Sequence, residues 1–362
     1  MRIAIVSTPS VRVPPKGYGG TELFCGHLAE ALLARGHEVT LFATGDSEFS
    51  GELRACYPKP TWPPSDTVEL THMRWCLNDI ACDRFGFDAV QINCAVGLRI
   101  ARDLGIPVVY TLHHHREEKL SRMYAAHPEV HFVAISRRQL ELEVPLRRAT
   151  VIHHGVDVGE YPASPRSKGY VLHLGRFAPE KGTHHAIDAA LRAKVPLVLA
   201  GRVHEKVDDH SYFDDELKPR LERAAARVRV AGEADHPRKL ALLQGASALL
   251  CPIEWEEPFG LIAIEAMLTG TPVIGFARGS FPEIIDPGVT GLLVSNVEEM
   301  ARAIHAVQGY SRRRCAARAR ERFSAGRMAA EYEQAFFSTI RRQSSSGLVL
   351  AHDFPRPSRL IG

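Results

Sequence analysis

Short apolar runs rich in β-branched residues alternate with amphipathic stretches along most of the chain. The runs predicted to be strands are 2–6, 38–43, 89–92, 108–112 and 131–135 in the first half, and 170–174, 197–200, 228–231, 248–251 and 272–276 in the second. Strands that helices cover on both faces have such continuous apolar sequences. The clearest helix is predicted over 21–35, and Gly36 follows it where helices often end in a left-handed residue. The pattern indicates an α/β fold with two parallel sheets.

The length of the chain indicates two domains, because 362 residues exceed what one core usually holds. Residues 161–169 have the proline, serine and glycine content of a linker. We expect an N-terminal domain over 1–160 and a C-terminal domain over 161–310, both doubly wound and facing each other across a cleft. We further expect a C-terminal helix over 311–342 that packs back toward the N-terminal domain, and a disordered tail over 343–362.

Composition narrows the class of protein. Apolar residues make up 45% and charged residues 24%, as in soluble globular proteins, and the formal net charge of +3 gives no case for nucleic-acid binding. No apolar run approaches the length of a membrane span, and 1–7 reads as a strand rather than a signal peptide. The seven cysteines form no disulfide or zinc pattern. We expect a cytoplasmic protein whose membrane contact is at most peripheral. The Arg-rich segment 312–322 is interpreted as a solvated helix face, with nucleic-acid binding as the less favoured alternative.

The segment 257–265 has the most informative polar residues. Glu257 precedes Pro258, which helices exclude from their interior, and the apolar run from Gly260 onward predicts a helix. Glu265 then lies about two turns inside that helix. The free amides of the first helical turn favour an anion, so the segment could hold a phosphorylated, hydroxyl-rich ligand. A surface helix with two solvated glutamates would give the same local pattern.

A second segment, 175–182, follows a predicted strand and precedes a helix, which is where open α/β sheets bind ligands. Arg176 can bind two phosphate oxygens at once, and Lys181 adds a mobile positive charge. Cations at strand ends are common, so this motif gains weight mainly from its pairing with 257–265.

The loop after the first strand contains Gly17-Tyr18-Gly19-Gly20 but lacks the G-x-G-x-x-G turn of dinucleotide-binding folds. It therefore argues against a nicotinamide or flavin site. Its glycines allow either a close approach of the backbone to a phosphate or simply a flexible loop.

Histidines cluster at 113–115, 153–154 and 184–185, but none of these clusters has the helical spacing of a zinc site. No Asp-x-Asp pair suggests a metal that bridges a diphosphate. We therefore predict no metal site. His113 ends the strand 108–112 and should point into the cleft as a neutral donor or acceptor, although most such histidines are merely polar surface.

Taken in order, these motifs resemble those of the retaining glycosyltransferases of family 4, which have the two-domain GT-B fold. The matching pieces are Gly19-Gly20-Thr21-Glu22, Arg35-Gly36-His37-Glu38-Val39, Thr111-Leu112-His113, Gly155-Val156-Asp157, Gly175-Arg176 with Glu180-Lys181-Gly182, the Glu257 to Glu265 segment, Gly270-Thr271-Pro272-Val273-Ile274, Pro282-Glu283-Ile284-Ile285 and Gly288-Val289-Thr290-Gly291. The resemblance extends to about Val294. Two departures are Pro258, where the family often has glycine, and Gly201-Arg202-Val203 in place of a more glycine-rich turn. The segment 203–219 looks like an insertion.

The resemblance implies a donor site. Arg176 and Lys181 would hold the diphosphate of a nucleotide sugar, Glu257 would contact hydroxyls of the hexose, and Glu265 would bind the ribose. The other implied contacts are the backbone of Phe259, Gly260 and Leu261 to the sugar and nearest phosphate, Gly20 to that phosphate from the opposite domain, His113 to the sugar, and Gly201 and Gly232 at the base.

The implied activity is transfer of a hexose, with retained configuration, from a nucleotide-diphosphate sugar to an acceptor hydroxyl without a metal or other cofactor. Family habit favours a UDP-sugar donor. The acceptor is a small molecule or an oligosaccharide, with antibiotic tailoring of the avilamycin type, surface polysaccharide and trehalose-type metabolism all open. Two other functions are compatible with the motifs, a nucleotide-sugar 2-epimerase of similar fold and a non-catalytic sugar-binding protein.

Overall fold

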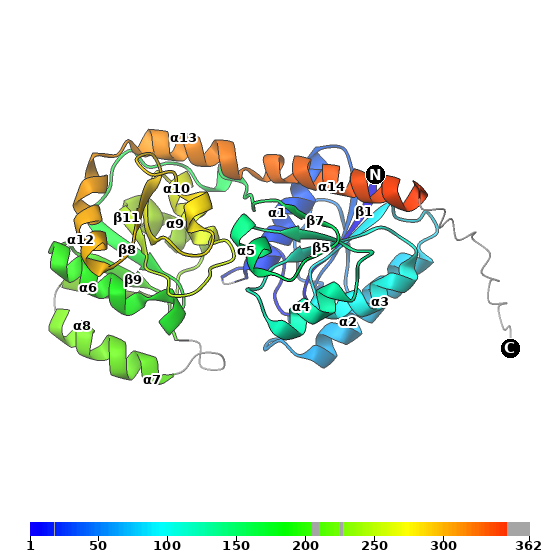
Figure 1. Ribbon diagram of the computed structural model, residues 1–362, viewed down its shortest axis with the longest axis horizontal. Helices are drawn as coiled ribbons and strands as arrows, with labels where there is room; N and C mark the ends of the chain where they lie inside the picture. The colour runs from blue at the N-terminus through cyan, green and yellow to red at the C-terminus, as the bar shows by residue number, and fades with distance from the viewer. Residues whose placement is uncertain (18, 204–209, 225–226, 346–362) are drawn as a thin grey trace.

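The computed structural model describes residues 1–17, 19–203, 210–224 and 227–345, and it consists of two α/β halves joined by C-terminal helices (Figure 1). Tyr18 of the first loop, part of the expected insertion at 203–219 and most of the expected tail lie outside the described residues. In each half a parallel sheet is enclosed by helices, as the alternating pattern predicts.

The N-terminal sheet has seven strands in the order β3-β2-β1-β4-β5-β6-β7, and every pairing is parallel. The strands are β1 (Arg2–Val6), β2 (Glu38–Phe42), β3 (Glu52–Arg54), β4 (Ala89–Ile92), β5 (Val108–Leu112), β6 (His131–Ala134) and β7 (Ala149–Val151). The five predicted strands are confirmed. The two that the sequence did not reveal are the three-residue edge strands β3 and β7, which are only partly buried and lack an apolar run.

The helices of this half are α1 (Gly20–Ala34), α2 (Asp66–Cys82), α3 (Leu98–Ala101), α4 (Glu118–Ala125) and α5 (Arg137–Leu142). Helix α1 matches its prediction within one residue at each end, and Gly36 has the left-handed φ of 85° that was expected beyond it. Phe24, Leu28 and Leu32 of α1 are buried against the sheet.

The C-terminal sheet has six parallel strands in the order β10-β9-β8-β11-β12-β13. They are β8 (Tyr170–Leu174), β9 (Leu197–Ala200), β10 (Val228–Gly232), β11 (Ala246–Cys251), β12 (Val273–Phe276) and β13 (Gly291–Val294). The helices are α6 (Thr183–Ala193), α7 (His210–Tyr212), α8 (Lys218–Ala224), α9 (His236–Gly245), α10 (Leu261–Leu268), α11 (Phe281–Ile284) and α12 (Val297–Ala306).

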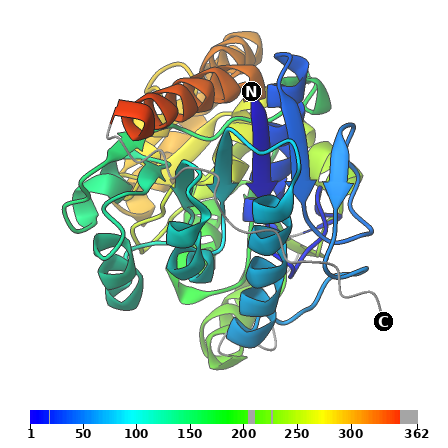
Figure 2. The same cartoon turned by 90° about the vertical axis from the view of Figure 1, so that its right-hand side faces the viewer.

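Two helices complete the chain. Helix α13 (Arg312–Phe323) packs on α10, and α14 (Ala325–Ser345) crosses to the N-terminal half and packs on α1. Figure 2 shows α14, in red, running along the N-terminal half. Its Tyr332 hydroxyl lies 2.8 Å from Thr111 Oγ1 of β5, deep in the N-terminal core. Helix α14 therefore contributes to the core of the N-terminal half, although it follows the C-terminal half in the sequence.

The reading of 312–322 as a solvated face is wrong for several of its arginines. The half-buried guanidinium of Arg312 donates to the carbonyl oxygens of Ser164 at 2.9 Å and Ala246 at 2.7 Å, and burial lowers its pKa. Arg322 Nη1 donates to Asp286 at 2.6 Å. Sequence could not show this, because the acceptors are backbone carbonyls and a loop carboxylate from distant segments.

Candidate active site

The carboxyl ends of the two sheets face each other, and helices α1 and α10 both begin there. A Cβ atom built on Gly20 would lie 3.5 Å from the Leu261 side chain, so the first turns of the two helices meet across the cleft. Neither helix has a side-chain cap on its first turn. At the start of α10, Gly260 has a φ of 88°, and an added Cβ would lie 2.7 Å from the Phe281 ring. A glycine is therefore required at this point, and free amide groups of the first turn face the cleft.

Lys181 and Glu257 meet beside the start of α10. Lys181 Nζ donates to Glu257 Oε2 at 2.6 Å, and Trp255 Nε1 donates to the same oxygen at 3.0 Å. The Lys181 ammonium also lies 4.5 Å from the centre of the Trp255 ring, within cation–π range. Within the described residues, no hydrogen bond reaches the second oxygen, Oε1, of Glu257. The carboxylate is thus held by one oxygen while the other can accept from a hydroxyl.

Three glycines adjoin one another where β8, β9 and β10 end. Gly201 donates its amide to the carbonyl of Gly232 at 2.9 Å, and a Cβ on Gly201 would lie only 1.8 Å from the carbonyl oxygen of Gly175. Arg176 follows Gly175 directly and donates to Glu180 Oε1 at 2.7 Å. The three glycines therefore let the ends of these strands pack closely against one another.

Glu265 occupies the second turn of α10, closer to the helix start than the sequence suggested, and is buried with 3% of its surface exposed. Its Oε1 accepts a hydrogen bond from the Tyr161 hydroxyl at 2.8 Å and pairs with the Lys239 ammonium at 2.6 Å. Sequence reasoning missed both partners, because Tyr161 lies in the segment taken for a linker and Lys239 lies on α9 without a motif.

His113 is held in one tautomer by a buried amide network in the N-terminal half. Its Nε2 lies 2.7 Å from Asn93 Oδ1, which also accepts from Gln91 Nε2 at 2.9 Å. Because Oδ1 can only accept, Nε2 of His113 carries the proton and Nδ1 keeps its lone pair. Burial and the neighbouring His154 place the pKa of His113 well below its usual range, so the ring is neutral at pH 7. Asn93 therefore orients the His113 ring, and sequence reasoning did not single it out.

A series of ring contacts connects His113 with Phe259, just before the start of α10. It stacks on His154, with ring centres 5.8 Å apart, and His154 in turn contacts Phe259 at 5.0 Å. Burial lowers the pKa of His154 to about 3, so this contact between the halves is uncharged at neutral pH.

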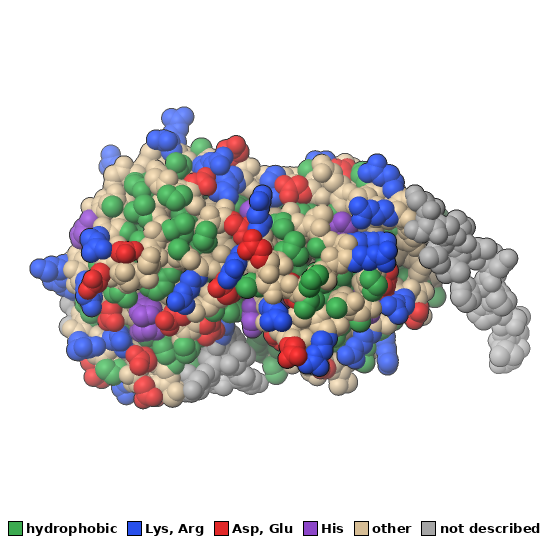
Figure 3. Space-filling model, in the orientation of Figure 1, with side chains coloured by type: hydrophobic (Ala, Val, Ile, Leu, Met, Phe, Trp, Pro, Cys, Tyr) green, Lys and Arg blue, Asp and Glu red, His purple; other side chains and the backbone are tan. Residues whose placement is uncertain are grey.

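Charged contacts also join the halves. Arg138 of α5 donates to Glu256 Oε2 at 2.8 Å, and Glu283 accepts from the amides of Arg137 and Arg138, both at 2.8 Å. Figure 3 shows acidic and basic side chains side by side at the junction. A small pocket opens beside these contacts, and it is lined by His115, Arg116, Arg138, Gln139, Leu142, Glu256, Glu257 and Pro258.

Two family models match this chain. Residues 18–160 match the model "Glycosyltransferase Family 4", and residues 161–322 match "Glycosyl transferases group 1". The chain belongs to glycosyltransferase family 4. This assignment confirms the resemblance of the motifs, and it makes the protein an enzyme that transfers a sugar from a nucleotide-sugar donor. It also decides against the 2-epimerase and the non-catalytic sugar-binding protein.

Curated relatives of this family 4 enzyme align over most of its length. Glycogen synthase of Mycobacterium tuberculosis is 27% identical over 373 residues, covering 85% of this chain and 86% of that protein. Phosphatidyl-myo-inositol mannosyltransferase of the same organism is 26% identical over 337 residues, covering 81% of this chain and 82% of that protein. One of these relatives is named as a synthase of glycogen and the other as a mannosyltransferase of phosphatidyl-myo-inositol. Because the two names differ, neither identifies the donor or the acceptor of this enzyme.

Solved structures share the fold of this family 4 enzyme. A glycosyltransferase involved in avilamycin A biosynthesis superposes with a TM-score of 0.74 and 23% identity, covering 94% of this chain and 98% of that one. Sucrose-phosphate synthase from Thermosynechococcus elongatus gives a TM-score of 0.77 at 21% identity, covering 94% and 100%. Anabaena Alr3699/HepE in complex with UDP and glucose gives 0.73 at 20%, covering 93% and 100%. These matches confirm the expected GT-B fold. Among the described residues, no helix combines the length and apolarity needed to cross a bilayer.

Proposed function

We propose that this enzyme transfers a hexose with retained anomeric configuration from a uridine-diphosphate sugar to an acceptor hydroxyl, with no metal on the diphosphate. The observation that carries the proposal is the meeting of Lys181, Glu257 and the uncapped first turn of α10 directly opposite Gly20. A positive charge, a carboxylate and free amides from two domains then face one small volume. A uridine donor is favoured because a protein of the same fold is known in complex with UDP and glucose.

Lys181 and Arg176 are the groups that would bind the diphosphate and stabilise its departure. A cation about 4 Å from a phosphate is worth roughly 4 kcal/mol at an effective dielectric near 20, before desolvation. The partial positive charge at the start of α10 adds to that field, and the amides of Phe259, Gly260 and Leu261 lie there. Fixed charges of this kind can replace a metal ion at the leaving group.

The proposed contacts to the hexose, the ribose and the base depend on where the other site residues lie. Glu257 Oε1 would accept from a hexose hydroxyl, and Glu265 would accept from the ribose beside Tyr161 and Lys239. Gly201 and Gly232, which are joined by a backbone hydrogen bond, would border the base, and at Gly201 the Gly175 carbonyl leaves no room for a side chain. Neutral His113 would offer a ring nitrogen to the sugar from the opposite half, and Gly20 would approach the phosphate.

The two cations give the direct test. Arg176→Ala and Lys181→Ala should each weaken UDP binding by roughly tenfold or more, since each removes a charged contact worth about 1.4 kcal/mol or more. Isothermal calorimetry with UDP measures the affinity, and transfer is followed as UDP release from UDP-glucose and other UDP-sugars.

Arg192→Ala is the matched control, because Arg192 pairs with Glu298 on the exposed side of α6. Its affinity for UDP should equal that of the unaltered enzyme. If both site variants also keep full affinity, the diphosphate binds elsewhere and the assignment fails.

A further inference from the structure

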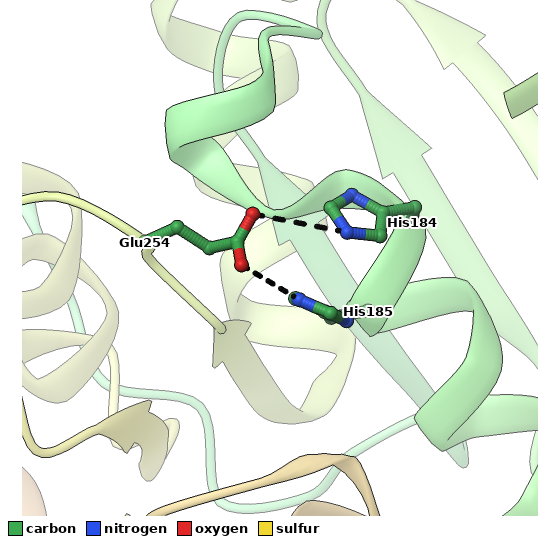
Figure 4. A group of neighbouring side chains, drawn as sticks. All are labelled: His184, His185 and Glu254. Carbon is green, nitrogen blue, oxygen red and sulfur yellow. Dashed lines mark hydrogen bonds and ion pairs between the residues drawn. The ribbon is translucent and has the colours of Figure 1, made fainter. Parts of the chain in front are cut away.

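Two histidines and a glutamate converge in the C-terminal domain, in an arrangement that the sequence did not predict. His184 and His185 occupy the first turn of α6, and Glu254 lies in the loop after β11. His185 Nε2 lies 3.1 Å from Glu254 Oε1, and His184 Nε2 lies 3.8 Å from Oε2. Figure 4 shows both rings turned toward the one carboxylate. One nitrogen or oxygen from each residue lies within 4.8 Å of the other two.

The separations fit a metal ion between these atoms. A tetrahedral zinc site has bonds of about 2.0–2.2 Å, which places its ligand atoms roughly 3.4 Å apart. Small side-chain rotations would bring the three atoms to that spacing. The centres of the two imidazole rings are only 3.9 Å apart, so one nitrogen from each ring can reach the same ion.

The surroundings hold the three side chains in place. His184 Nδ1 lies 2.8 Å from the Tyr212 hydroxyl, an arrangement that directs Nε2 toward Glu254, and His185 packs against the Phe276 ring. The main chain of Glu254 is fixed as well, since its amide donates to the Glu180 carbonyl at 2.9 Å. Metal-binding histidines typically have a hydrogen-bond partner on the second ring nitrogen, as His184 has in the Tyr212 hydroxyl.

We propose that His184, His185 and Glu254 bind one divalent transition-metal ion of the zinc, cobalt or nickel class. Two imidazole nitrogens and one carboxylate select these ions over magnesium and calcium, which prefer all-oxygen sites. All three side chains are partly exposed, so water can enter and complete the coordination.

The ion would join two segments that also carry donor-site residues. Lys181 precedes His184 by three positions, and Glu257 follows Glu254 by three, so the metal and the Lys181–Glu257 ion pair link the same two loops. The loops already touch closely, because a Cβ on Gly182 would lie 1.8 Å from the Pro252 carbonyl oxygen. The metal would stabilise this pair of loops without contacting the diphosphate, so its binding can be tested independently of transfer.

The test uses untagged, chelator-treated, full-length protein titrated with Zn(II) in a calorimeter and with Co(II) in a spectrophotometer. We expect one equivalent of Zn(II) to bind, and Co(II) to give the visible bands of a nitrogen- and oxygen-ligated ion. His185→Gln and Glu254→Gln should each lower the affinity by more than about tenfold, and Tyr212→Phe should cost about tenfold, as loss of an outer hydrogen bond generally does.

His305→Gln is the matched control, since it removes an exposed histidine from α12 of the same domain and should leave the affinity unchanged. Melting temperatures in chelator check that each variant folds. A variant of normal melting temperature that no longer gains stability from Zn(II) supports the site. Absence of binding, equal affinity in all variants, or a cobalt spectrum with thiolate bands from the cysteines would overturn it.

Discussion

At the residue scale, Glu257 serves two purposes through its two carboxylate oxygens. Oε2 is occupied by Lys181 and Trp255, which fixes the orientation of the group. Because Oε2 is fixed, Oε1 is also held in one position. The carboxylate therefore needs its negative charge to pair with Lys181 and a fixed orientation to present Oε1 to a hydroxyl.

Glu257→Gln separates these two requirements. The amide keeps the shape of the side chain but removes its negative charge, so both the pairing with Lys181 and the acceptor for a sugar hydroxyl become weaker. Lys181 keeps its own charge for the diphosphate, so sugar positioning should suffer more than nucleotide binding. We expect kcat to fall about 10²-fold, in the range found for loss of one transition-state contact, while the Kd for UDP changes less than about threefold. Steady-state kinetics and calorimetry on the same preparation measure both. Equal losses in kcat and UDP affinity would move Glu257 out of the sugar pocket.

Asn93 gives a second prediction, because its amide sets the tautomer of His113. In Asn93→Asp a carboxylate would face Nε2 of His113 and favour the imidazolium, so the pKa of His113 should rise from its present low value. Activity at pH 7 should fall and recover at higher pH, where the ring is neutral again. A pH–rate profile and an NMR titration of the imidazole protons measure this change. The buried ring of His131, which hydrogen-bonds Thr150 in another part of the sheet, should titrate as before. An unchanged His113 titration would show that Asn93 does not control it.

Sequence indicated the residues at strand ends and helix starts but not those that orient them. Lys181 and Glu257 belong to recognisable segments and do meet, at 2.6 Å. Asn93, Lys239 and Tyr161 reach the site from elements far apart in sequence, and no local pattern marks them. His184 and His185 were set aside because a helical spacing was sought, whereas the structure joins adjacent histidines through a carboxylate from another loop.

At the element scale, the ends of β8 and β9 depend on a glycine contact. The missing side chain of Gly201 allows the Gly175 carbonyl to approach, and the φ of Gly201 is 143°. Gly201→Ala would force a Cβ to within 1.8 Å of that oxygen unless the backbone shifts. We expect a loss of about 2 kcal/mol or more in unfolding free energy, with weaker UDP binding because the base pocket deforms.

Urea unfolding and UDP calorimetry measure the two effects. Gly309→Ala is the control, because a Cβ there meets nothing within 4 Å and the backbone is not left-handed. A Gly201→Ala protein as stable as the control would show that the strand ends can relax at little cost.

Element prediction succeeded where a run of β-branched or apolar residues marks the strand in the sequence. The interior strands are apolar on both faces and were located from their runs. The edge strand β10 was also located, although its side chains are mostly exposed or half-buried, whereas the edge strand β13 was not predicted. The edge strands β3 and β7 have three residues each and exposed or half-buried side chains, so they carry no such mark. For α13 the helix was foreseen but its environment was not, since arginines that bind carbonyls look the same in sequence as arginines in water.

At the scale of the whole molecule, buried neutral histidines make stability depend on pH. Burial lowers the pKa to about 4 for His27, His72, His131 and His173 and to about 3 for His154. In the unfolded chain these groups titrate near pH 6.5, about their ordinary pKa. Below that pH the unfolded state takes up protons that the folded state cannot, so stability falls as the pH drops from about 6.5 toward 4. For each group, a pKa that is lower by one in the folded state corresponds to a loss of at most roughly 1.4 kcal/mol.

Three carboxyl groups act in the opposite direction over part of this range, because burial raises the pKa values of Glu22, Glu69 and Glu160. The histidines outnumber them, so the net slope should remain positive with pH. Urea midpoints at about pH 7.5, 6.5, 5.5 and 4.5 should therefore decrease steadily once the pH is below the histidine range of the unfolded chain. His131→Gln removes one titrating group. The slope of the unfolding free energy against pH should therefore correspond to about one proton fewer in the difference between the unfolded and folded states. A stability that stays constant across this pH series would mean that these histidines become protonated inside the folded enzyme.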